Sequence, residues 1–244
     1  QAHEMNPQEE EILNRLGNAY FDERRYDKAA EAFEKALAIN PDSPGYLMNY
    51  GASLLRLGKL ENAKEVFEKA HERAGDWPQL QLNLGLVHEA LESWEEAEQA
   101  YLSATTLGPQ FPQAHFALAC FYEQRKRRRE AMEAYSRFLE LEPDNATALF
   151  SLVQNALKTL RLAPAMATVR QCLIKEPINP AAHYCLLFLS LIAGKWGQAR
   201  SHYQELRRQD SDLRAEADIL LVKLGLWAIA VGLVLAVILT LTLM

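Results

Sequence analysis

The sequence LNRLGNAYFDERRYDKAAEAFEKA, residues 13–36, decides the fold. Its first part, residues 13–20, has the pattern L-x-x-L-G-x-x-Y, and its second part, residues 29–36, has the pattern A-x-x-x-F-x-x-A. Residues three and four apart lie on the same face of a helix. The stretch therefore predicts two antiparallel helices, each with one face for packing.

The same pattern returns every 34 residues, as the spacing of Pro109, Pro143 and Pro177 indicates. In a frame that begins at Glu10, position 20 is alanine in all six repeats. Position 8 is small in the first four repeats, and position 24 is aromatic in all repeats but the fifth. The predicted repeats are 10–43, 44–77, 78–111, 112–145, 146–179 and 180–213, with an extension at 1–9 and a linker or capping helix at 214–223.

Each recurring residue type in this frame has a packing role. A small residue at positions 8 and 20 lets the two helices of a repeat approach closely, and the ring at position 24 is expected to fill the wedge against the next repeat. Proline at position 32 ends the second helix. Each helix pair leaves an apolar face that only a neighbouring repeat can cover, which predicts a solenoid.

These residues resemble the tetratricopeptide repeat family over 204 of 244 residues. The resemblance implies an all-α, right-handed superhelical solenoid that binds proteins and is not an enzyme. Repeats five and six depart from the family pattern, because Val153 and Leu187 replace the small residue at position 8 and Ser211 replaces the proline. We expect these departures to widen the local helix spacing.

Residues 224–244 contain no charged side chain. As a helix, these 21 residues would be roughly 31 Å long, the thickness of a bilayer core. We expect a single transmembrane helix, the alternatives being a buried core helix or a retained targeting signal. Arg207, Arg208, Arg214 and Lys223 precede it, which favours a cytoplasmic solenoid unless an N-terminal signal was removed. Small residues recur along one side and predict packing against another membrane helix or a second copy: Gly225, Ala228, Gly232, Ala236 and Thr240.

Composition and motifs exclude several functions. The chain has 26 Lys+Arg against 32 Asp+Glu, a net charge of −6, which disfavours nucleic acid as a partner. No enzyme motif such as GxGxxG, GxSxG or HExxH occurs, and no cofactor is indicated. His183 and Cys185 lie two apart on a predicted helix and face different ways, so a metal site with Cys172 is not expected.

The family resemblance implies that the first helix of each repeat lines a concave groove. Its position 6 carries Asn49 and Asn83, whose amides suit a peptide backbone. Position 5, with Phe188 at position 9 of the last repeat, predicts an apolar stripe for an amphipathic helix or peptide, unless these side chains belong to the core. The stripe consists of Met48, Leu82, Phe116, Phe150, Tyr184 and Phe188.

Charge is expected to differ between the two edges of the solenoid. The turns inside the repeats carry cations, most densely at Lys126, Arg127, Arg128 and Arg129, and the turns between repeats carry carboxylates. The basic edge could face anionic lipid or an acidic partner, or it could be an ordinary solvated edge.

The sequence thus predicts a membrane-anchored interaction scaffold, an accessory or assembly subunit of an integral membrane complex, with protein and lipid partners and a possible homo-oligomer. The alternative is a membrane-tethered co-chaperone or targeting receptor. The family's chaperone-tail clamp is disfavoured because its cationic positions carry Asn14, Gln79 and Asn83 here. A client carboxylate would have no counter-ion.

Overall fold

A computed structural model of the chain describes residues 7–209 and 215–219. The chain divides into two compact units, unit 1 (residues 1–121) and unit 2 (residues 122–244), and each is considered by itself. Within the described ranges every regular element is an α-helix, which confirms the predicted all-α helical-repeat class.

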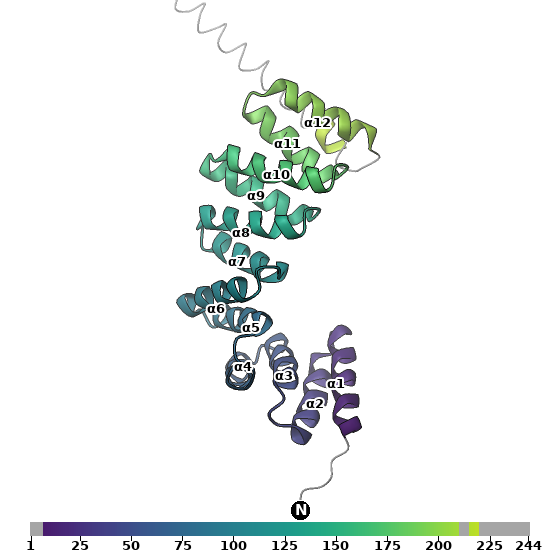
Figure 1. Cartoon of the computed structure of the whole chain (residues 1–244), viewed down its shortest axis with the longest axis vertical. Coiled ribbons are helices and arrows are strands. Elements are labelled where there is room, and N and C mark those ends of the chain that lie inside the picture. The colour runs from purple at the N-terminus through teal and green to yellow at the C-terminus, as the bar shows by residue number, and fades with distance from the viewer. Residues whose placement is uncertain (1–6, 210–214, 220–244) are drawn as a thin grey trace, which may run out of the picture. The chain divides into compact units, whose positions relative to one another are not determined.

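The helices alternate between a first (A) and a second (B) helix of each repeat (Figure 1). The A helices are α1 (Pro7–Asp22), α3 (Pro44–Arg56), α5 (Pro78–Ala90), α7 (Pro112–Gln124), α9 (Ala146–Thr159) and α11 (Pro180–Ile192). The B helices are α2 (Tyr26–Ile39), α4 (Leu60–Ala74), α6 (Trp94–Leu107), α8 (Arg128–Leu141), α10 (Leu162–Lys175) and α12 (Trp196–Arg208). From α3 onward, successive A helices begin 34 residues apart, as do all the B helices.

In unit 1 the glycine at position 8 lies directly under the ring at position 24 of the same repeat. A Cβ on Gly51 would lie 2.7 Å from Phe67 Cε1, and a Cβ on Gly85 would lie 2.6 Å from Tyr101. Both rings are fully buried. The ring at position 24 was predicted to contact the next repeat, and Tyr101 does so as well: its ring centroid lies 5.6 Å from that of Phe121. The contact with the glycine of its own repeat is the closer one. Glycine is therefore required for the close approach of the A and B helices.

The turn between A and B helices has the same backbone in every repeat. Position 15 has φ between 56° and 74° in all six, although only Gly58 and Gly194 are glycines there. The next residue donates its N–H to the carbonyl five residues back, as from Arg127 to Tyr122 at 2.9 Å and from Arg161 to Ala156 at 2.9 Å. This is the Schellman arrangement that ends helices in a left-handed residue.

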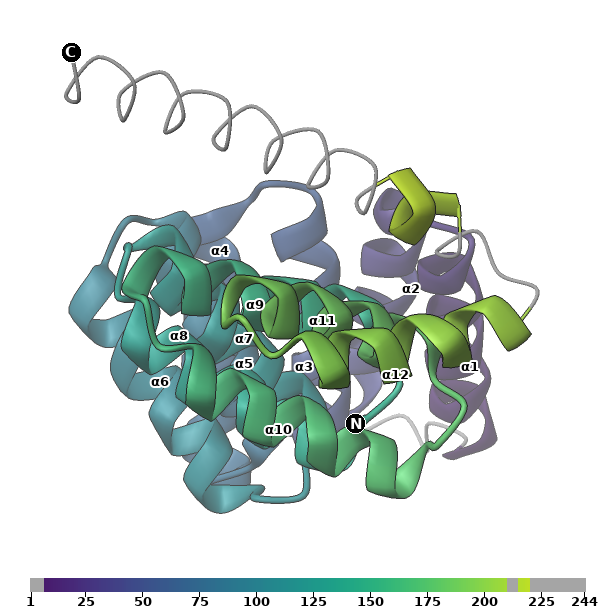
Figure 2. The same ribbon diagram turned by 90° about the horizontal axis from the view of Figure 1, so that it is seen from above.

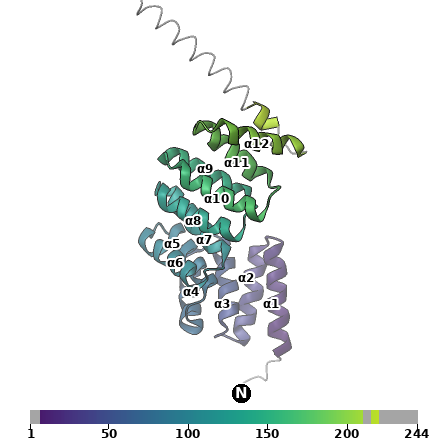
Figure 3. The same ribbon diagram turned by 45° about the horizontal axis from the view of Figure 1, so that its top comes forward.

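The A helices begin at residues suited to a first turn. Pro44, Pro78 and Pro180 occupy the first helical positions, where a missing N–H costs nothing. Asn145 and Asn179 cap α9 and α11 by accepting hydrogen bonds from Ala148 N and Ala182 N at 3.0 and 3.1 Å. Within unit 2, α9 and α11 are in contact and lie side by side (Figures 2 and 3).

A short helical segment, residues 215–219, covers the last repeat. Ala217 is fully buried in a cluster with Leu187, Leu191 and Leu206. The Tyr203 hydroxyl donates a hydrogen bond to Asp218 Oδ1 at 2.6 Å. The apolar face of the last helix pair is therefore covered by the chain's own following residues.

The predicted transmembrane helix at 224–244 lies outside the described residues, as do its predicted packing residues Gly225, Ala228, Gly232, Ala236 and Thr240. Over 7–209 and 215–219, no helix has the length and apolar content needed to cross a bilayer.

Candidate protein-binding surface

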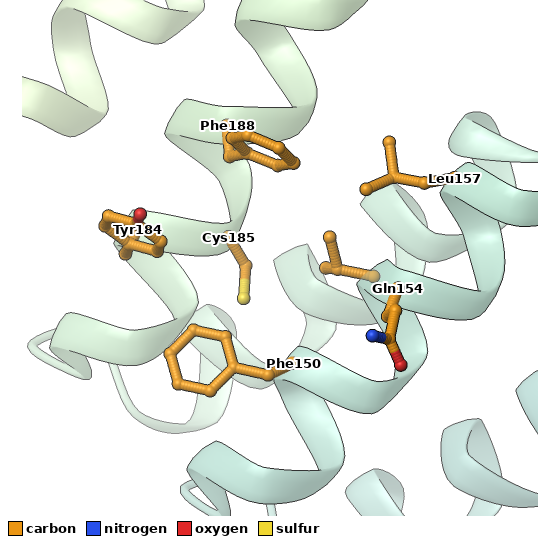
Figure 4. A pocket seen from close by; sticks show the side chains of 7 residues that line it. Phe150, Gln154, Leu157, Tyr184, Cys185 and Phe188 are labelled. Carbon is orange, nitrogen blue, oxygen red and sulfur yellow. The ribbon is translucent and has the colours of Figure 1, made fainter. Parts of the chain in front are cut away.

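Unit 2 contains an apolar pocket between α9 and α11 (Figure 4). Its volume is about 190 Å³. Three of the predicted groove residues, Phe150, Tyr184 and Phe188, line it. The Phe150 and Tyr184 rings meet edge to face, with centroids 6.1 Å apart at 83°. The position-5 stripe therefore contributes side chains to a real concavity in this unit.

The remaining lining residues were not predicted: Val153, Gln154, Leu157 and Cys185. Gln154, Leu157 and Cys185 occupy positions 9, 12 and 6 of their repeats, which belong to the groove-facing positions of the family. Reading all these positions together, instead of position 5 alone, would have identified them. Val153 stands at position 8, where the first three repeats have glycine.

Two lining residues have pKa values moved by burial. Burial raises the pKa of the Cys185 thiol to about 12, with a further rise from nearby Cys172. Burial also raises the pKa of the Tyr184 hydroxyl, and Glu216 and Cys185 add to the effect. Both side chains are therefore neutral near pH 7. The pocket offers apolar contact, with Gln154 as its polar side chain (Figure 4).

In unit 1 one residue of the predicted stripe belongs to the core and the other two are half-buried. Leu82 is only 6% exposed, and Met48 packs against the buried cluster around Leu54 and Phe67. The reason is that α5 is buried on nearly every side, from Leu80 to Val87, so a short aliphatic side chain at this position is covered. Leu82 is therefore corrected from a groove residue to a packing residue, whereas Met48 and Phe116 are half-buried.

The predicted asparagine row is also partly used within the chain. Asn49 Nδ2 donates to Asn14 Oδ1 at 3.1 Å and to Asn18 Oδ1 at 3.2 Å. Because both amide hydrogens are taken, Asn49 can meet a peptide only as an acceptor. Asn83 is buried in α5, with 9% of its surface exposed. Asn49 and Asn83 therefore do not form a row of solvent-accessible amide donors in unit 1.

The predicted basic cluster at residues 126–129 has one member with a structural role. The Arg127 guanidinium lies 4.5 Å from the centroid of the Tyr122 ring and pairs with Glu130 at 3.0 Å. A backbone hydrogen bond, then Arg127, lowers the pKa of Glu130. Arg25 stacks on Tyr20 in the same way at 4.6 Å in the first repeat. Lys126 and Arg129 are exposed, and Arg128 is half-buried.

No metal site was expected at His183, Cys185 and Cys172, and the structure shows the contacts that His183 and Cys172 make instead. His183 Nε2 donates to Pro177 O at 3.0 Å, and its Nδ1 lies 3.1 Å from His202 Nδ1. Cys172 donates weakly to Leu139 O at 3.9 Å. In the described parts of the chain, no three His, Cys, Asp or Glu side chains are grouped so that they could hold a metal ion.

Antiparallel helix pairs that recur every 34 residues define a helical-repeat protein. The sequence matches three tetratricopeptide repeat profiles, at residues 10–43, 51–115 and 112–145. The chain belongs to the tetratricopeptide repeat family, whose members are in general protein–protein interaction scaffolds without enzymatic activity. The repeats at 146–213 were found from the 34-residue frame and lie beyond these matches.

Solved structures support the fold. PilF of Pseudomonas aeruginosa is 20% identical with a TM-score of 0.61, over 87% of this chain and 97% of that chain. A MamA protein is 21% identical with a TM-score of 0.56, over 70% and 94%. A thermophilic tetratricopeptide repeat protein of Thermus thermophilus is 25% identical with a TM-score of 0.55, over 69% and 92%. No curated protein sequence matches this chain significantly.

Proposed function

We propose that the protein is a membrane-anchored scaffold whose unit 2 binds an apolar side chain of a partner protein in the pocket between α9 and α11. The observation that carries this proposal is the pocket itself, lined by Phe150, Leu157, Tyr184 and Phe188. Apolar concavities with a few placed polar groups are the usual form of binding sites.

The size of the pocket indicates what it would hold. A cavity of about 150 Å³ is large enough to bind benzene. The pocket of about 190 Å³ therefore has room for one aromatic or leucine-sized side chain. Gln154 lies beside it and could hydrogen-bond the peptide that carries this side chain (Figure 4). We infer that the partner segment is apolar and enters by one anchoring residue.

The membrane part of the proposal is supported by residues 224–244, which hold no charge over a bilayer-spanning length. In this function the solenoid lies at a membrane, on the cytoplasmic side, as an accessory or assembly subunit. Small residues such as Gly232 would let the segment pack against an integral partner. A co-chaperone role is less well supported, because the clamp positions Asn14, Gln79 and Asn83 carry no positive charge to pair with a client carboxylate.

The pocket is tested with the full chain in nanodiscs and a phage-displayed library of amphipathic peptides. Selected peptides are labelled, and their affinities are measured by fluorescence anisotropy. The double variant Phe150→Ala/Phe188→Ala should bind at least about tenfold more weakly, as for hot-spot aromatics. Leu102→Ala, an exposed change on α6, is the matched control and should leave the affinity unchanged. Unchanged affinity in a folded double variant would exclude the pocket.

The anchor is tested separately by alkaline extraction and by purification in mild detergent. Wild-type protein should stay in the membrane fraction and co-purify with an integral partner at fixed stoichiometry. Gly232→Leu should stay in the membrane fraction but leave the complex, because the larger side chain blocks close helix packing. Substoichiometric chaperones in the purified sample would instead support the co-chaperone alternative.

A further inference from the structure

The turns between A and B helices differ sharply in charge between the two units. We define the turn edge of unit 2 as residues 124–130, 158–164 and 192–198, which are positions 13–19 of its repeats. This edge carries eight Lys or Arg and one Glu. The same positions in unit 1, residues 22–28, 56–62 and 90–96, carry five Lys or Arg and seven Asp or Glu. The basic edge predicted for the whole chain is therefore a property of unit 2.

The positive charge on this edge faces solvent. Its one carboxylate, Glu130, is paired with Arg127 at 3.0 Å. The other cations lie at the ends of α7, α9 and α11 and at the starts of the following helices. Exposed members are Lys126, Arg129, Lys158, Arg161 and Lys195. Such a surface attracts an anionic partner.

Large apolar side chains stand among these cations. Leu160 is 86% exposed, Trp196 is 68% exposed and Ile192 is 47% exposed. Leu160 sits at φ 56°, where the Schellman turn fixes the backbone. Exposed tryptophan and leucine beside lysine and arginine are typical of surfaces that meet a bilayer interface, where the ring is half in and half out of the apolar region.

The opposite edge of unit 2 has a different character. Its turns, residues 142–145 and 176–179, carry Glu142, Asp144 and Glu176, all exposed. Ile178 is 77% exposed there, so apolar exposure is similar but the charge is acidic. An anionic surface would repel this edge and attract the turn edge. Charge complementarity therefore selects one edge.

The short chain between the last repeat and residues 224–244 limits how far unit 2 can lie from the membrane. This inference rests on the proposed membrane anchor. Ala217 is packed on the last repeat. From Ile219 to Leu224 the chain has five peptide links, which span at most about 18 Å. This reach is less than the length of α12, about 20 Å for 13 residues. If residues 224–244 enter a bilayer, Ile219 lies within about 18 Å of its surface, which keeps the last repeat close to the membrane.

We propose that the turn edge of unit 2 docks on an anionic lipid bilayer. Leu160, Ile192 and Trp196 enter the headgroup region, and the cations beside them contact lipid phosphates and carboxylates. The edge thereby orients unit 2 on the membrane, with its acidic edge away from the lipid.

The test uses the full chain in nanodiscs of phosphatidylcholine, with or without phosphatidylserine, and brominated lipid as quencher. Trp77, Trp94 and Trp227 are changed to Phe, so that Trp196 is the sole tryptophan of the four. Its emission should be largely lost in anionic discs and less so in neutral discs. The matched control, Trp196→Phe/Ile178→Trp in the same background, places the reporter on the acidic edge and should stay bright.

Charge variants test the electrostatic part. Lys158→Glu/Arg161→Glu/Lys195→Glu should abolish the quenching of Trp196. Arg56→Glu/Lys59→Glu, the same kind of change on the turns of unit 1, should leave it intact. Each cation near an anionic surface contributes about fivefold. Because residues 224–244 would hold either protein in the disc, the effect is read from the quenching of Trp196 in anionic discs, where the triple variant should shift the ratio of docked to undocked edge by at least roughly a hundredfold.

The outcomes separate the edge from the anchor. Protein that elutes with the discs but keeps Trp196 bright overturns the docking proposal and leaves the anchor in place. Protein that does not enter discs, yet floats with anionic vesicles and not with neutral ones, overturns the anchor and supports the edge. If Trp196 stays bright and the triple variant loses an acidic protein partner, the edge is a protein site and the lipid proposal is wrong.

Discussion

Unit 1 and unit 2 share one repeat frame but treat its key positions differently. In unit 1, Gly51 and Gly85 each lie under an aromatic ring of the same repeat, and this packing buries the ring between the two helices. In unit 2, Val153 occupies position 8 of the fifth repeat, and apolar side chains line a pocket and extend along the turn edge. The repeat frame therefore specifies the backbone, whereas a few side chains decide which surfaces are left for partners.

The glycine under each ring provides the largest expected effect. Gly51→Val would drive methyl groups into Phe67, because even a Cβ would lie 2.7 Å from its ring. We expect a loss of about 3 kcal/mol in the free energy of unfolding, measured by urea denaturation. Adding Phe67→Val copies the Val153 and Val169 pair of unit 2 and should recover part of the loss.

Gly45→Val is the matched control for this experiment. A Cβ at Gly45 meets no atom within 4 Å, so the variant should keep nearly wild-type stability. Equal denaturation midpoints for Gly51→Val and Gly45→Val would show that the ring does not require glycine.

The pair of buried His183 and half-buried His202 gives unit 2 a pH dependence. Burial, then His183 and Arg170, lowers the pKa of His202 to about 4. Unfolding returns the pKa to about 6.5, so the unfolded state binds more protons between these values. Stability should be complete above pH 6.5 and should fall as the pH drops toward 4, by up to about 2 kcal/mol after discounting for partial exposure.

His202→Gln should remove most of this acid sensitivity, because glutamine does not titrate. Urea denaturation at pH 7.5 and pH 4.5 measures the effect. A variant whose loss between the two pH values equals that of wild type would assign the acid sensitivity to other groups.

A hydrogen-bond network in unit 2 has a simpler counterpart in unit 1. Glu123 accepts from the Tyr135 hydroxyl at 2.7 Å and from Asn155 Nδ2 at 2.7 Å. In unit 1, Glu89 accepts from Tyr101. Tyr135→Phe should lower the free energy of unfolding by about 1.5 kcal/mol, the usual value for a bond to a charged acceptor.

A double-mutant cycle sharpens the comparison. Tyr135→Phe and Asn155→Ala should show a non-zero coupling energy, because the two side chains share one carboxylate. Tyr135→Phe with Tyr101→Phe should be additive, because those two bonds share no group. Additivity in the first pair would mean that the two bonds act independently.

The smallest expected effect is a gain in stability at the turn of repeat five. Leu160 holds φ 56° in the Schellman turn that ends α9, and its side chain, 86% exposed, makes little buried contact that would offset the strain. Leu160→Gly should raise the free energy of unfolding by about 0.5–1 kcal/mol, because glycine adopts this backbone without strain. Gly194→Leu, at the same position of repeat six, should lower it. A loss in Leu160→Gly would show that the leucine side chain stabilises the turn.

The repeat frame could be predicted from sequence because its signals are local. Glycine, alanine and aromatic residues recur at fixed spacing, and each reports on contacts within one repeat. Exposure at position 5 could not be predicted in the same way. Leu82 and Phe150 occupy the same position, but Leu82 is covered and Phe150 lines the pocket. That outcome depends on side-chain size and on neighbouring helices, which the frame does not encode.

Charge could be read from sequence, but the role of each charge could not. Arg127 and Arg129 are equivalent in a count of cations. The structure places Arg127 over Tyr122 and against Glu130, whereas Arg129 is exposed. Aromatic stacking depends on the turn's backbone, which brings positions 11 and 16 together. Only after this turn is known do the exposed cations separate from the structural ones.

The hydrogen bond from Tyr203 to Asp218 and the burial of Ala217 have a mechanical consequence. Tension applied through the following residues would enter the fold at the last helix pair. Repeats hold only their neighbours, so α12 would peel away before the tension reached the repeats behind it. Under pulling, the molecule should therefore extend in steps of one helix pair or less. The hydrogen bond between Tyr203 and Asp218 sets the force at which the first step occurs.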